Sequence, residues 1–191
     1  MLINSQLVDK AITKTLVKKL DILPSNVNLS GAEIELVNMV GREKILKDRI
    51  KGLNDKYDYI LIDCPPSLGI LTLNALNAAQ ELFIPIQAEF FALEGMTKLL
   101  HTIKLVKERL NRKLEISGII LTMFDGRKNI CKDVAQKVEE FFKEKAFKTR
   151  IRDNVKLAEA PSYGQPVILY APRSHGSLDY QKLAKEVLSH A

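Results

Sequence analysis

Short apolar runs that alternate with amphipathic segments constrain the fold of this chain more than any other feature of its sequence. Tyr57–Cys64, Leu82–Gln87 and Ile116–Met123 are apolar on both faces, and Leu20–Leu23 and Phe147–Ile151 are shorter or weaker runs. Strands of this kind are typical of a parallel sheet covered by helices on both sides. The pattern predicts an α/β fold with three layers, in which helices flank a mostly parallel sheet.

The segments between the runs have the period of an α-helix. Apolar residues recur every three or four positions in Leu93–Leu110 and Asn129–Lys145, and Leu178–Leu188 is a third candidate that Ser177 is expected to cap. Met1–Lys19 also reads as an amphipathic helix. These apolar faces predict core contacts and require no cofactor.

Composition excludes several classes of protein. The 191 residues fit one domain, and no run approaches the ~20 apolar residues that span a bilayer. Cys64 and Cys131 form no metal-type pair, which argues against an iron–sulfur protein and suggests a reducing cytoplasm. His101, His175 and His190 show no catalytic or metal spacing. The net charge of +6 permits binding to DNA or to an anionic membrane, but charge alone favours a solvated, slightly basic surface.

Asp63 is the most informative polar residue. It ends the run Tyr57–Cys64, so its carboxylate is expected at the carboxyl edge of the sheet, where open α/β folds bind ligands. A carboxylate there can hold Mg²⁺ beside nucleotide phosphates, and the alternative is an Asp that caps the next turn. Pro65 and Pro66 end the run and stiffen the exit.

The whole string Tyr57–Gly69, followed by Leu73-Asn74-Ala75-Leu76, resembles the Walker B and switch II region of the ParA/Soj family of partition ATPases, in its chromosomal Soj branch. The resemblance runs from about Leu20 to the end of the chain. It continues, in the family's order, through Ser30–Val37, Ile84–Gly95, Leu121–Arg127 and Asn154–Ser162.

The resemblance implies roles for individual residues. Asp63 corresponds to the aspartate that helps to hold Mg²⁺, and Pro65–Gly69 to the segment that responds to the γ-phosphate. The ends of the later strands and the loop Asn154–Pro161 correspond to the walls of the adenine pocket. The nucleotide site implied in this way comprises Asp63, Pro65, Thr122, Met123, Asn154, Glu159 and Pro161.

Non-specific DNA binding is the second implied activity. Arg127 and Lys156 stand where Soj-type proteins carry DNA-binding cations, and Arg150 and Arg152 lie near them in the sequence. Lys and Arg on one face neutralise phosphates without reading bases. The alternative for each is an exposed cation without a partner. Asp153 stands where the family often has Arg, so a contact made by that Arg is not expected here.

The family's phosphate-binding loop, Lys-Gly-Gly-x-Gly-Lys-Thr-Thr, has no counterpart in the sequence. Gly31, Gly41 and Gly52 are isolated, and Lys14-Thr15 lacks the glycines. The chain is therefore expected to be a partial ParA-type domain over residues 1–191, with a helical lead-in at 1–19 and the family match at 20–191. ATP binding should be impaired, catalytic residues are not assigned, and Tyr57–Asp63 should show an unpaired edge because the missing strand lies beside it in the family.

The leading functional hypothesis is segregation of a chromosome or plasmid. The family binds ATP and Mg²⁺, forms homodimers, binds DNA non-specifically and works with a ParB-like partner, in the cytoplasm and on the nucleoid. One alternative is a non-catalytic module that binds DNA, a ParB-like partner or an intact homologue. Another is a MinD-like membrane-associated ATPase, although Glu186–Ala191 shows no basic amphipathic tail after the last helix, so no membrane partner is expected.

Overall fold

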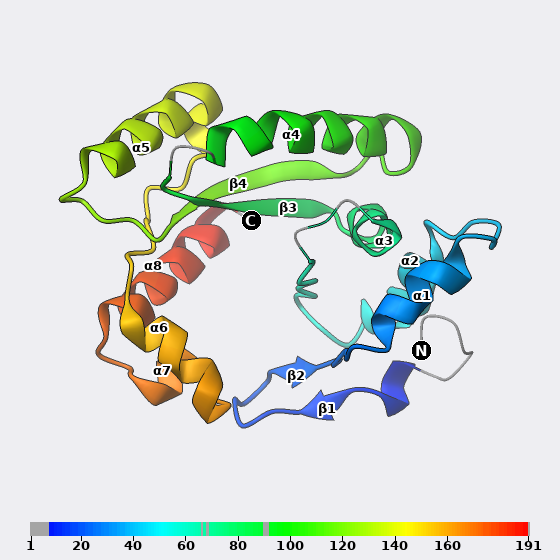
Figure 1. Cartoon of the computed structure of the whole chain (residues 1–191). Helices are drawn as coiled ribbons and strands as arrows, with labels where there is room; N and C mark the ends of the chain where they lie inside the picture. The colour runs from blue at the N-terminus through cyan, green and yellow to red at the C-terminus, as the bar shows by residue number, and fades with distance from the viewer. Residues whose placement is uncertain (1–7, 66, 68, 90–91, 191) are drawn as a thin grey trace. The chain divides into compact units, whose positions relative to one another are not determined.

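The computed structural model describes residues 8–65, 67, 69–89 and 92–190. The chain forms two compact units. The N-terminal unit comprises Met1–Gln80 and Ile103–Leu114, and the C-terminal unit comprises Glu81–Thr102 and Glu115–Ala191. Figure 1 shows the helices and strands in chain order.

A small β-hairpin opens the described part of the N-terminal unit. After a 3-10 turn, η1 (Val8–Lys10), strand β1 (Thr13–Lys14) pairs antiparallel with β2 (Asp21–Ile22). The predicted helix over Met1–Lys19 is therefore wrong for residues 8–19, and its first seven residues lie outside the described part. The short run at Leu20–Leu23 does form a strand.

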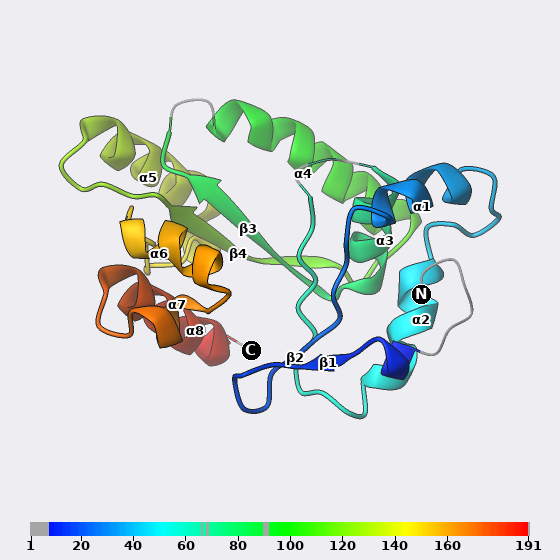
Figure 2. The ribbon, with the colours of Figure 1, turned by 60° about the horizontal axis from the view of Figure 1, so that its bottom comes forward.

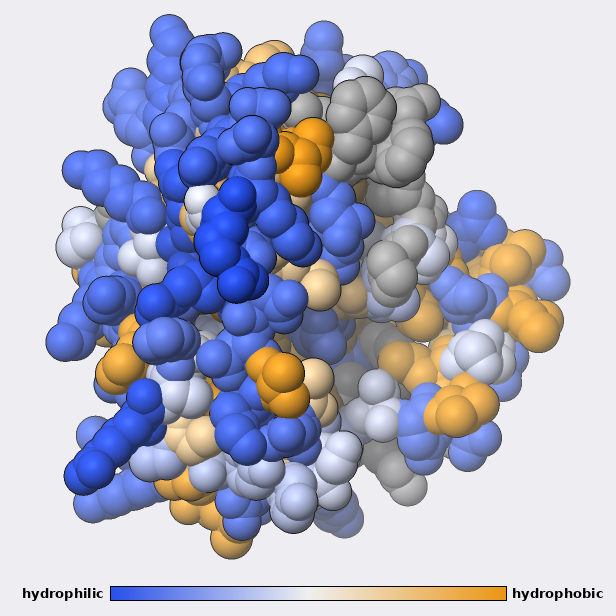
Figure 3. Space-filling model, turned by 60° about the vertical axis from the view of Figure 1, so that its left-hand side comes forward, coloured by the Kyte–Doolittle hydropathy of each residue, from blue (hydrophilic) through white to orange (hydrophobic). Residues whose placement is uncertain are grey.

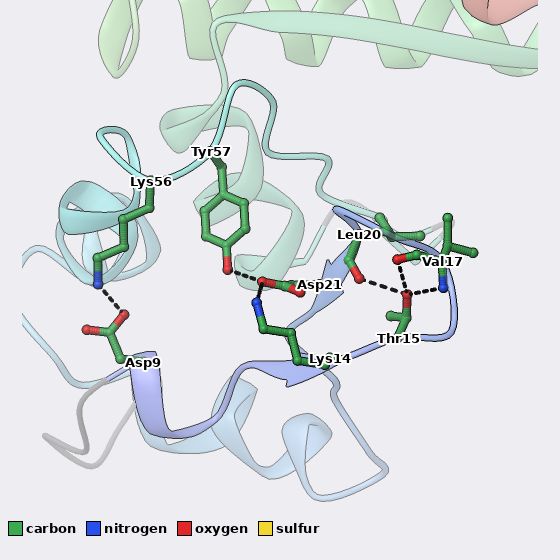
Figure 4. A network of polar contacts seen from close by, with 8 residues as sticks. All are labelled: Asp9, Lys14, Thr15, Val17, Leu20, Asp21, Lys56 and Tyr57. Atoms are coloured by element: carbon green, nitrogen blue, oxygen red, sulfur yellow. Dashed lines mark hydrogen bonds and ion pairs between the residues drawn. The ribbon is translucent and has the colours of Figure 1, made fainter.

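Side chains close the loop of this hairpin and explain why it is not a helix. The hydroxyl of Thr15 donates to the carbonyl of Leu20 at 2.7 Å and accepts from the backbone N–H of Val17 at 3.1 Å. Such local bonds compete with helical ones. Figure 4 shows this loop beside the carboxylate of Asp21, which accepts from Lys14 and from the hydroxyl of Tyr57, each at 2.7 Å.

Three helices of the N-terminal unit follow the hairpin: α1 (Leu29–Leu36), α2 (Ile45–Ile50, continued by the 3-10 turn η2, Lys51–Leu53) and α3 (Ile70–Ala78). The second part of α4 (Ala92–Arg109), from Ile103 on, also belongs to this unit. Buried Asn74 on α3 joins two of them. Its amide nitrogen donates to the carbonyl of Arg42 at 2.7 Å, and its amide oxygen accepts from the backbone N–H of Leu46 at 3.0 Å. It therefore caps the N-terminus of α2 from another helix.

The segment Tyr57–Cys64 is not a strand, so the strand prediction is wrong there. The chain leaves regular structure at Tyr57 and regains it at α3. The side chains of Tyr59 and Leu61 are 60% and 87% exposed. A strand requires a neighbour to satisfy its backbone groups, and no ladder with another described residue forms here. The unpaired strand edge expected at Tyr57–Asp63 is likewise not formed, because this segment is not a strand.

A parallel sheet lies at the centre of the C-terminal unit, as predicted. Strand β3 (Glu81–Gln87) pairs with β4 (Glu115–Thr122) in a register that joins Ile84 to Ile119 and Gln87 to Thr122. The weak run at Phe147–Ile151 follows the other edge of β4. It forms no full strand, and isolated parallel bridges flank it, one from Ala146 to Ile119 and one from Arg152 to Phe124.

Helices cover both faces of this sheet, which confirms the three-layer prediction. Figures 1 and 2 show α5 and α4 along one face and α8 along the other. Helix α4 occupies the segment predicted at Leu93–Leu110, and its part up to Thr102 belongs to this unit. Helix α5 and the 3-10 turn η3 occupy the segment predicted at Asn129–Lys145. The bounds are α4 Ala92–Arg109, α5 Asn129–Phe142, η3 Lys143–Lys145, α6 Val155–Glu159, η4 Ala160–Tyr163, α7 Val167–Tyr170 and α8 His175–His190.

The last helix starts earlier than predicted, so Ser177 is not its cap. The hydroxyl of Ser174 accepts from the backbone N–H of Ser177 at 3.2 Å, and Ser177 is fully buried. No helix in the described part of the chain is long and apolar enough to cross a membrane.

Candidate functional site

The site residues predicted from the sequence fall into both units. Asp63 and Pro65 belong to the N-terminal unit. The other nine, which include all four predicted DNA-binding cations, belong to the C-terminal unit. Pro66 and Leu68, within the predicted γ-phosphate segment, lie outside the described residues.

Asp63 is exposed at the end of the extended segment that precedes α3. Pro65 begins a tight turn, in which its carbonyl accepts from the N–H of Ser67 at 2.8 Å. The hydroxyl of Thr72 then donates to the carbonyl of Ser67 at 2.6 Å and ties this turn to α3. Partial burial, followed by the charge of Asp63, raises the pKa of the Cys64 thiol.

A single carboxylate can contribute to a Mg²⁺ site but does not form one. The described residues contain no group of three or more His, Cys, Asp or Glu placed to hold a metal ion. Mg²⁺ at nucleotide sites keeps several waters and is held by one or two carboxylates together with phosphate oxygens. Asp63 fits that role, provided that water and nucleotide supply the other ligands.

Thr122 and Met123 end strand β4. The hydroxyl of Thr122 donates to the carbonyl of Ile86 at 3.3 Å, and its own carbonyl accepts from the N–H of Ala88 at 3.1 Å. Met123 has a left-handed backbone (φ 51°) and a side chain that is 48% exposed. A non-glycine residue in that region is uncommon and marks a sharp turn at the end of the strand.

The structure brings the end of β4 beside the loop that contains Asn154. Phe124 donates its N–H to the carbonyl of Ile151 at 3.0 Å, and Asp153 donates its N–H to the carbonyl of Phe124 at 3.3 Å. Two of the predicted adenine-pocket segments, far apart in the sequence, therefore lie side by side in the C-terminal unit.

Asn154 and Glu159 stabilise this loop through their side chains. Asn154 caps α6 by accepting from the N–H of Lys156 at 3.0 Å. Glu159 accepts from the ammonium of Lys156 and from the hydroxyl of Tyr170, each at 2.8 Å. These bonds lower the pKa of Glu159, and the bond to Glu159 raises the pKa of Tyr170 to about 12. Pro161 is exposed in η4, next to these contacts.

All four predicted DNA-binding cations are paired with carboxylates. Arg127, whose side chain is 91% exposed, forms two bonds to Asp125 at 3.0 and 2.8 Å. This guanidinium holds the pKa of the Asp125 carboxyl well below its usual range. Lys156, paired with Glu159, is 49% exposed. Both cations are thus accessible to a phosphate, while their carboxylate partners Asp125 and Glu159 are only 16% and 36% exposed.

The side chains of Arg150 and Arg152 are less exposed, at 32% and 42%. Arg150 donates to Glu139 at 2.6 Å and lies over the ring of Phe124 at 4.7 Å. Arg152 forms a bidentate pair with Asp179, at 2.8 and 2.7 Å, and Asp179 is only 3% exposed. Arg152 therefore joins α8 to the loop before α6, which is a structural role that sequence reasoning missed.

The surface near these residues is polar. Figure 3 brings forward the side of the molecule that carries α5 and α6 in Figure 1, and most of that face is hydrophilic.

Two of the ion-pair partners could have been predicted from the spacing of charges in the sequence, because Asp125 lies two residues from Arg127 and Glu159 lies three residues from Lys156. Glu139 and Asp179 lie far in the sequence from Arg150 and Arg152, and no sequence pattern indicated that they form ion pairs.

The sequence of the chain is similar to those of known proteins. The model of a family described as an AAA domain matches residues 1–116. The Bacillus subtilis sporulation initiation inhibitor protein Soj is 48% identical over 190 residues, which are 100% of this chain and 75% of that protein. The chromosome partitioning protein ParA of Myxococcus xanthus is 46% identical over 98% of this chain and 66% of its own length.

Solved structures share the fold. Cobyrinic acid a,c-diamide synthase from Mycobacterium smegmatis, with bound ADP and magnesium, superimposes with a TM-score of 0.83 at 31% identity, over 99% of this chain and 69% of that one. The cell division ATPase MinD of Pyrococcus furiosus gives 0.77 at 26% identity, over 97% and 72%. The chain thus has the P-loop NTPase-like fold that its sequence predicts.

Proposed function

Because the chain belongs to the ParA/Soj family of chromosome-partitioning proteins, we propose that it acts in DNA segregation by binding DNA non-specifically through its C-terminal unit. The observation that carries this proposal is the exposure of Arg127 and Lys156, at 91% and 49% of their side chains. Arg127 lies in the loop after β4 and Lys156 on helix α6, both in one compact unit, and both cations are accessible to solvent. Non-specific affinity arises from such contacts between cations and phosphates.

The four predicted cations contribute unequally in this proposal. Arg127 and Lys156 bind DNA phosphates. Arg150 adds a partly exposed charge. Arg152 stays bound to Asp179, because leaving a buried carboxylate unpaired costs several kcal/mol.

A charge-reversal experiment tests the proposal. The variant Arg127→Glu/Lys156→Glu should bind a fluorescent DNA duplex of arbitrary sequence at least about tenfold more weakly than the wild type, because two phosphate contacts are lost. The matched control is Lys47→Glu/Lys51→Glu, which reverses two exposed cations of the N-terminal unit. Equal losses in the two variants would show a general charge effect and would contradict the proposed site.

Nucleotide binding by this chain is proposed to be weak. Relatives of known structure hold ADP, or an ATP analogue, with magnesium, but the sequence contains no glycine-rich loop to surround the phosphates. Asp63 is the residue we assign to Mg²⁺. Calorimetry with ATP and Mg²⁺ should show no micromolar binding. Tight, Mg²⁺-dependent binding that Asp63→Ala abolishes would overturn this part of the proposal.

The cellular role follows from the family. We propose that the chain is associated with the nucleoid and that it binds a ParB-like protein and a second ParA-type subunit. A non-catalytic module is the second candidate function, which the lack of a phosphate-binding loop in the sequence favours. It predicts binding of DNA or of an intact relative without ATP hydrolysis.

A further inference from the structure

The guanidinium of Arg127 is held in one orientation, although this side chain is 91% exposed. Its Nε donates to Oδ1 of Asp125 at 3.0 Å, and its Nη2 donates to Oδ2 of the same carboxylate at 2.8 Å. Two parallel bonds between planar groups fix the plane of the guanidinium as well as its distance from the acceptor. Asp125 therefore determines where the charge of Arg127 lies.

Asp125 is itself held by the loop between β4 and α5. Its Oδ1 also accepts from the backbone N–H of Arg127 at 3.0 Å, and its carbonyl accepts from the N–H of Lys128 at 3.1 Å. The preceding residue, Phe124, donates its N–H to the carbonyl of Ile151 at 3.0 Å. Aspartate side chains that accept from the backbone two residues on commonly close such turns. The side chain of Asp125 is 16% exposed, so the loop supplies a fixed support for Arg127.

One edge of the guanidinium stays available for a ligand. A guanidinium has five N–H groups in a planar fork, and Asp125 accepts from the one on Nε and from one on Nη2. The two on Nη1 and the second on Nη2 have no acceptor within the part of the chain that the structure describes. The edge that Nη1 and Nη2 form together matches two oxygens of a phosphate group. A phosphate can therefore bind Arg127 while Asp125 remains in place.

Lys156 differs from Arg127 in this respect. Its ammonium donates to Glu159 at 2.8 Å through a single bond. An ammonium is a point charge on a flexible stem, so one bond does not fix the directions of its other N–H groups. Glu159 also accepts from the hydroxyl of Tyr170 at 2.8 Å. The positioning of a cation by a carboxylate is therefore a property of the pair formed by Asp125 and Arg127.

Asp125 has two opposite effects on the binding of DNA. Its negative charge repels phosphates, and the bonds from Arg127 hold the pKa of its carboxyl well below the usual range, so this charge persists at neutral pH. Its contact with Arg127, however, orders a long side chain before DNA arrives, so less conformational entropy is lost on binding. Salt screens the repulsion at this exposed loop but does not affect the ordering. The ordering should therefore outweigh the repulsion at physiological salt.

We propose that Asp125 is a positioning residue for DNA binding: it holds Arg127 so that the free edge of the guanidinium binds a phosphate, and it stays bonded to Arg127 in the complex. This inference rests on the proposed DNA binding by Arg127 and extends it. Asp125, whose charge alone would weaken the binding of DNA, raises the affinity instead.

The sign of one substitution tests this role. Asp125→Asn in the full chain keeps an oxygen for the backbone N–H of Arg127, so the turn is retained, but it cannot hold both guanidinium nitrogens as a carboxylate does. Its affinity for a fluorescent duplex of arbitrary sequence should fall about three- to tenfold, although a negative charge is lost. The matched control is Asp133→Asn, the same change at an exposed position of α5, which should bind at least as tightly as the wild type. Unchanged or higher affinity of Asp125→Asn would overturn the proposal.

A double-mutant cycle separates positioning from a general effect on the loop. In the Arg127→Gln background Asp125 has no guanidinium to hold, so Asp125→Asn should no longer lower the affinity. An equal loss in both backgrounds would show that Asp125 acts through the fold of the loop, and would contradict its proposed role. If Arg127→Gln itself binds DNA like the wild type, the proposed DNA contact fails, and the role of Asp125 fails with it. Weaker binding by Arg127→Gln together with normal binding by Asp125→Asn would contradict the role of Asp125 alone.

A spectroscopic measurement on the wild type does not depend on the folding of Asp125→Asn. The NMR signal of the Asp125 carboxyl carbon should keep its position when duplex DNA is added, because the pair with Arg127 persists. Arg127→Gln gives the reference position of this signal without the guanidinium. A shift of the wild-type signal toward that reference on adding DNA would show that phosphate displaces Asp125, and the proposal would be wrong.

Discussion

Asp179 is a buried carboxylate of the C-terminal unit, 3% exposed and bonded to Arg152. Burial alone would raise the pKa of its carboxyl, but the hydrogen bonds and the charge of Arg152 outweigh burial, and the pKa lies below its usual value. A carboxyl with a lowered pKa stabilises the fold above its unfolded pKa of about 3.9, and this stabilisation is lost as the pH falls through the folded pKa.

Asp179→Asn should therefore lower the free energy of unfolding by about 1–3 kcal/mol at pH 7, because it removes the charge from a bidentate pair. Urea denaturation measures the loss, and the difference from the wild type should shrink below about pH 3.9. Glu139→Gln, which removes the carboxylate from a half-exposed pair, is the control and should cost less than about 1 kcal/mol. A difference that is constant with pH would argue against the pair as the cause.

Lys143 is a position where the backbone prefers glycine. It follows α5 with φ 51° and ψ −121°, a region that side chains rarely occupy. Lys143→Gly should raise the free energy of unfolding by about 1 kcal/mol, measured by urea denaturation. Lys145→Gly, in the same turn but without positive φ, should not stabilise. Stabilisation by both variants, or by neither, would contradict the explanation.

At the scale of elements, the packing of Phe147 onto β4 explains a glycine. A Cβ atom at Gly118 would lie 2.1 Å from the ring of Phe147, which also stacks on Phe83 with 5.9 Å between centroids. This close approach lets the Phe147–Ile151 segment lie against the strand.

Gly118→Ala should destabilise the protein by about 1–3 kcal/mol through overpacking, as judged by thermal or urea unfolding. Adding Phe147→Leu should recover part of that loss, since the smaller side chain leaves room for the new methyl group. If the two substitutions were simply additive, the contact would not be the cause.

Asn74 is expected to hold α2 in place. Asn74→Ala removes its bonds to Arg42, Leu46 and Ile70 and should cost about 2 kcal/mol. Hydrogen exchange should show the amide of Leu46 losing protection before the centre of α3 does. Uniform loss of protection across the N-terminal unit would instead mean global destabilisation.

Elements with strong local patterns were predictable from the sequence, and those that depend on a partner were not. The periodic segments of α4 and α5 and the apolar runs of β3 and β4 appear where expected. Tyr57–Cys64 has an equally strong apolar run, but a strand forms only when another strand satisfies its backbone. Residues 8–19 have a helical pattern of apolar residues, yet the hydroxyl of Thr15 stabilises a loop instead.

The sequence predicted which residues belong to the candidate site, but not which carboxylates pair with its cations. Motifs identified Asp63, Arg127 and Lys156, which are all exposed in the structure. They did not indicate that Arg152 is bound to Asp179, because ion pairs between distant segments leave no local pattern.

At the scale of the whole molecule, this chain of the partition family has two compact units, and the C-terminal unit carries the proposed DNA contacts. The net charge of +6 supports weak, general attraction to DNA. Net charge alone does not show which face of the molecule binds DNA. Contacts at particular residues predict a specific change in the salt dependence of binding, because each phosphate that a cation neutralises contributes to that dependence.

The most direct test is therefore the slope of log affinity for duplex DNA against log salt concentration, for the wild type and for Arg127→Gln/Lys156→Gln. Each phosphate contact contributes about 0.9 to the slope, so the variant's slope should be shallower by about 1.8. Its affinity should fall for every DNA sequence alike. An unchanged slope and affinity would contradict the central claim that these two residues bind DNA.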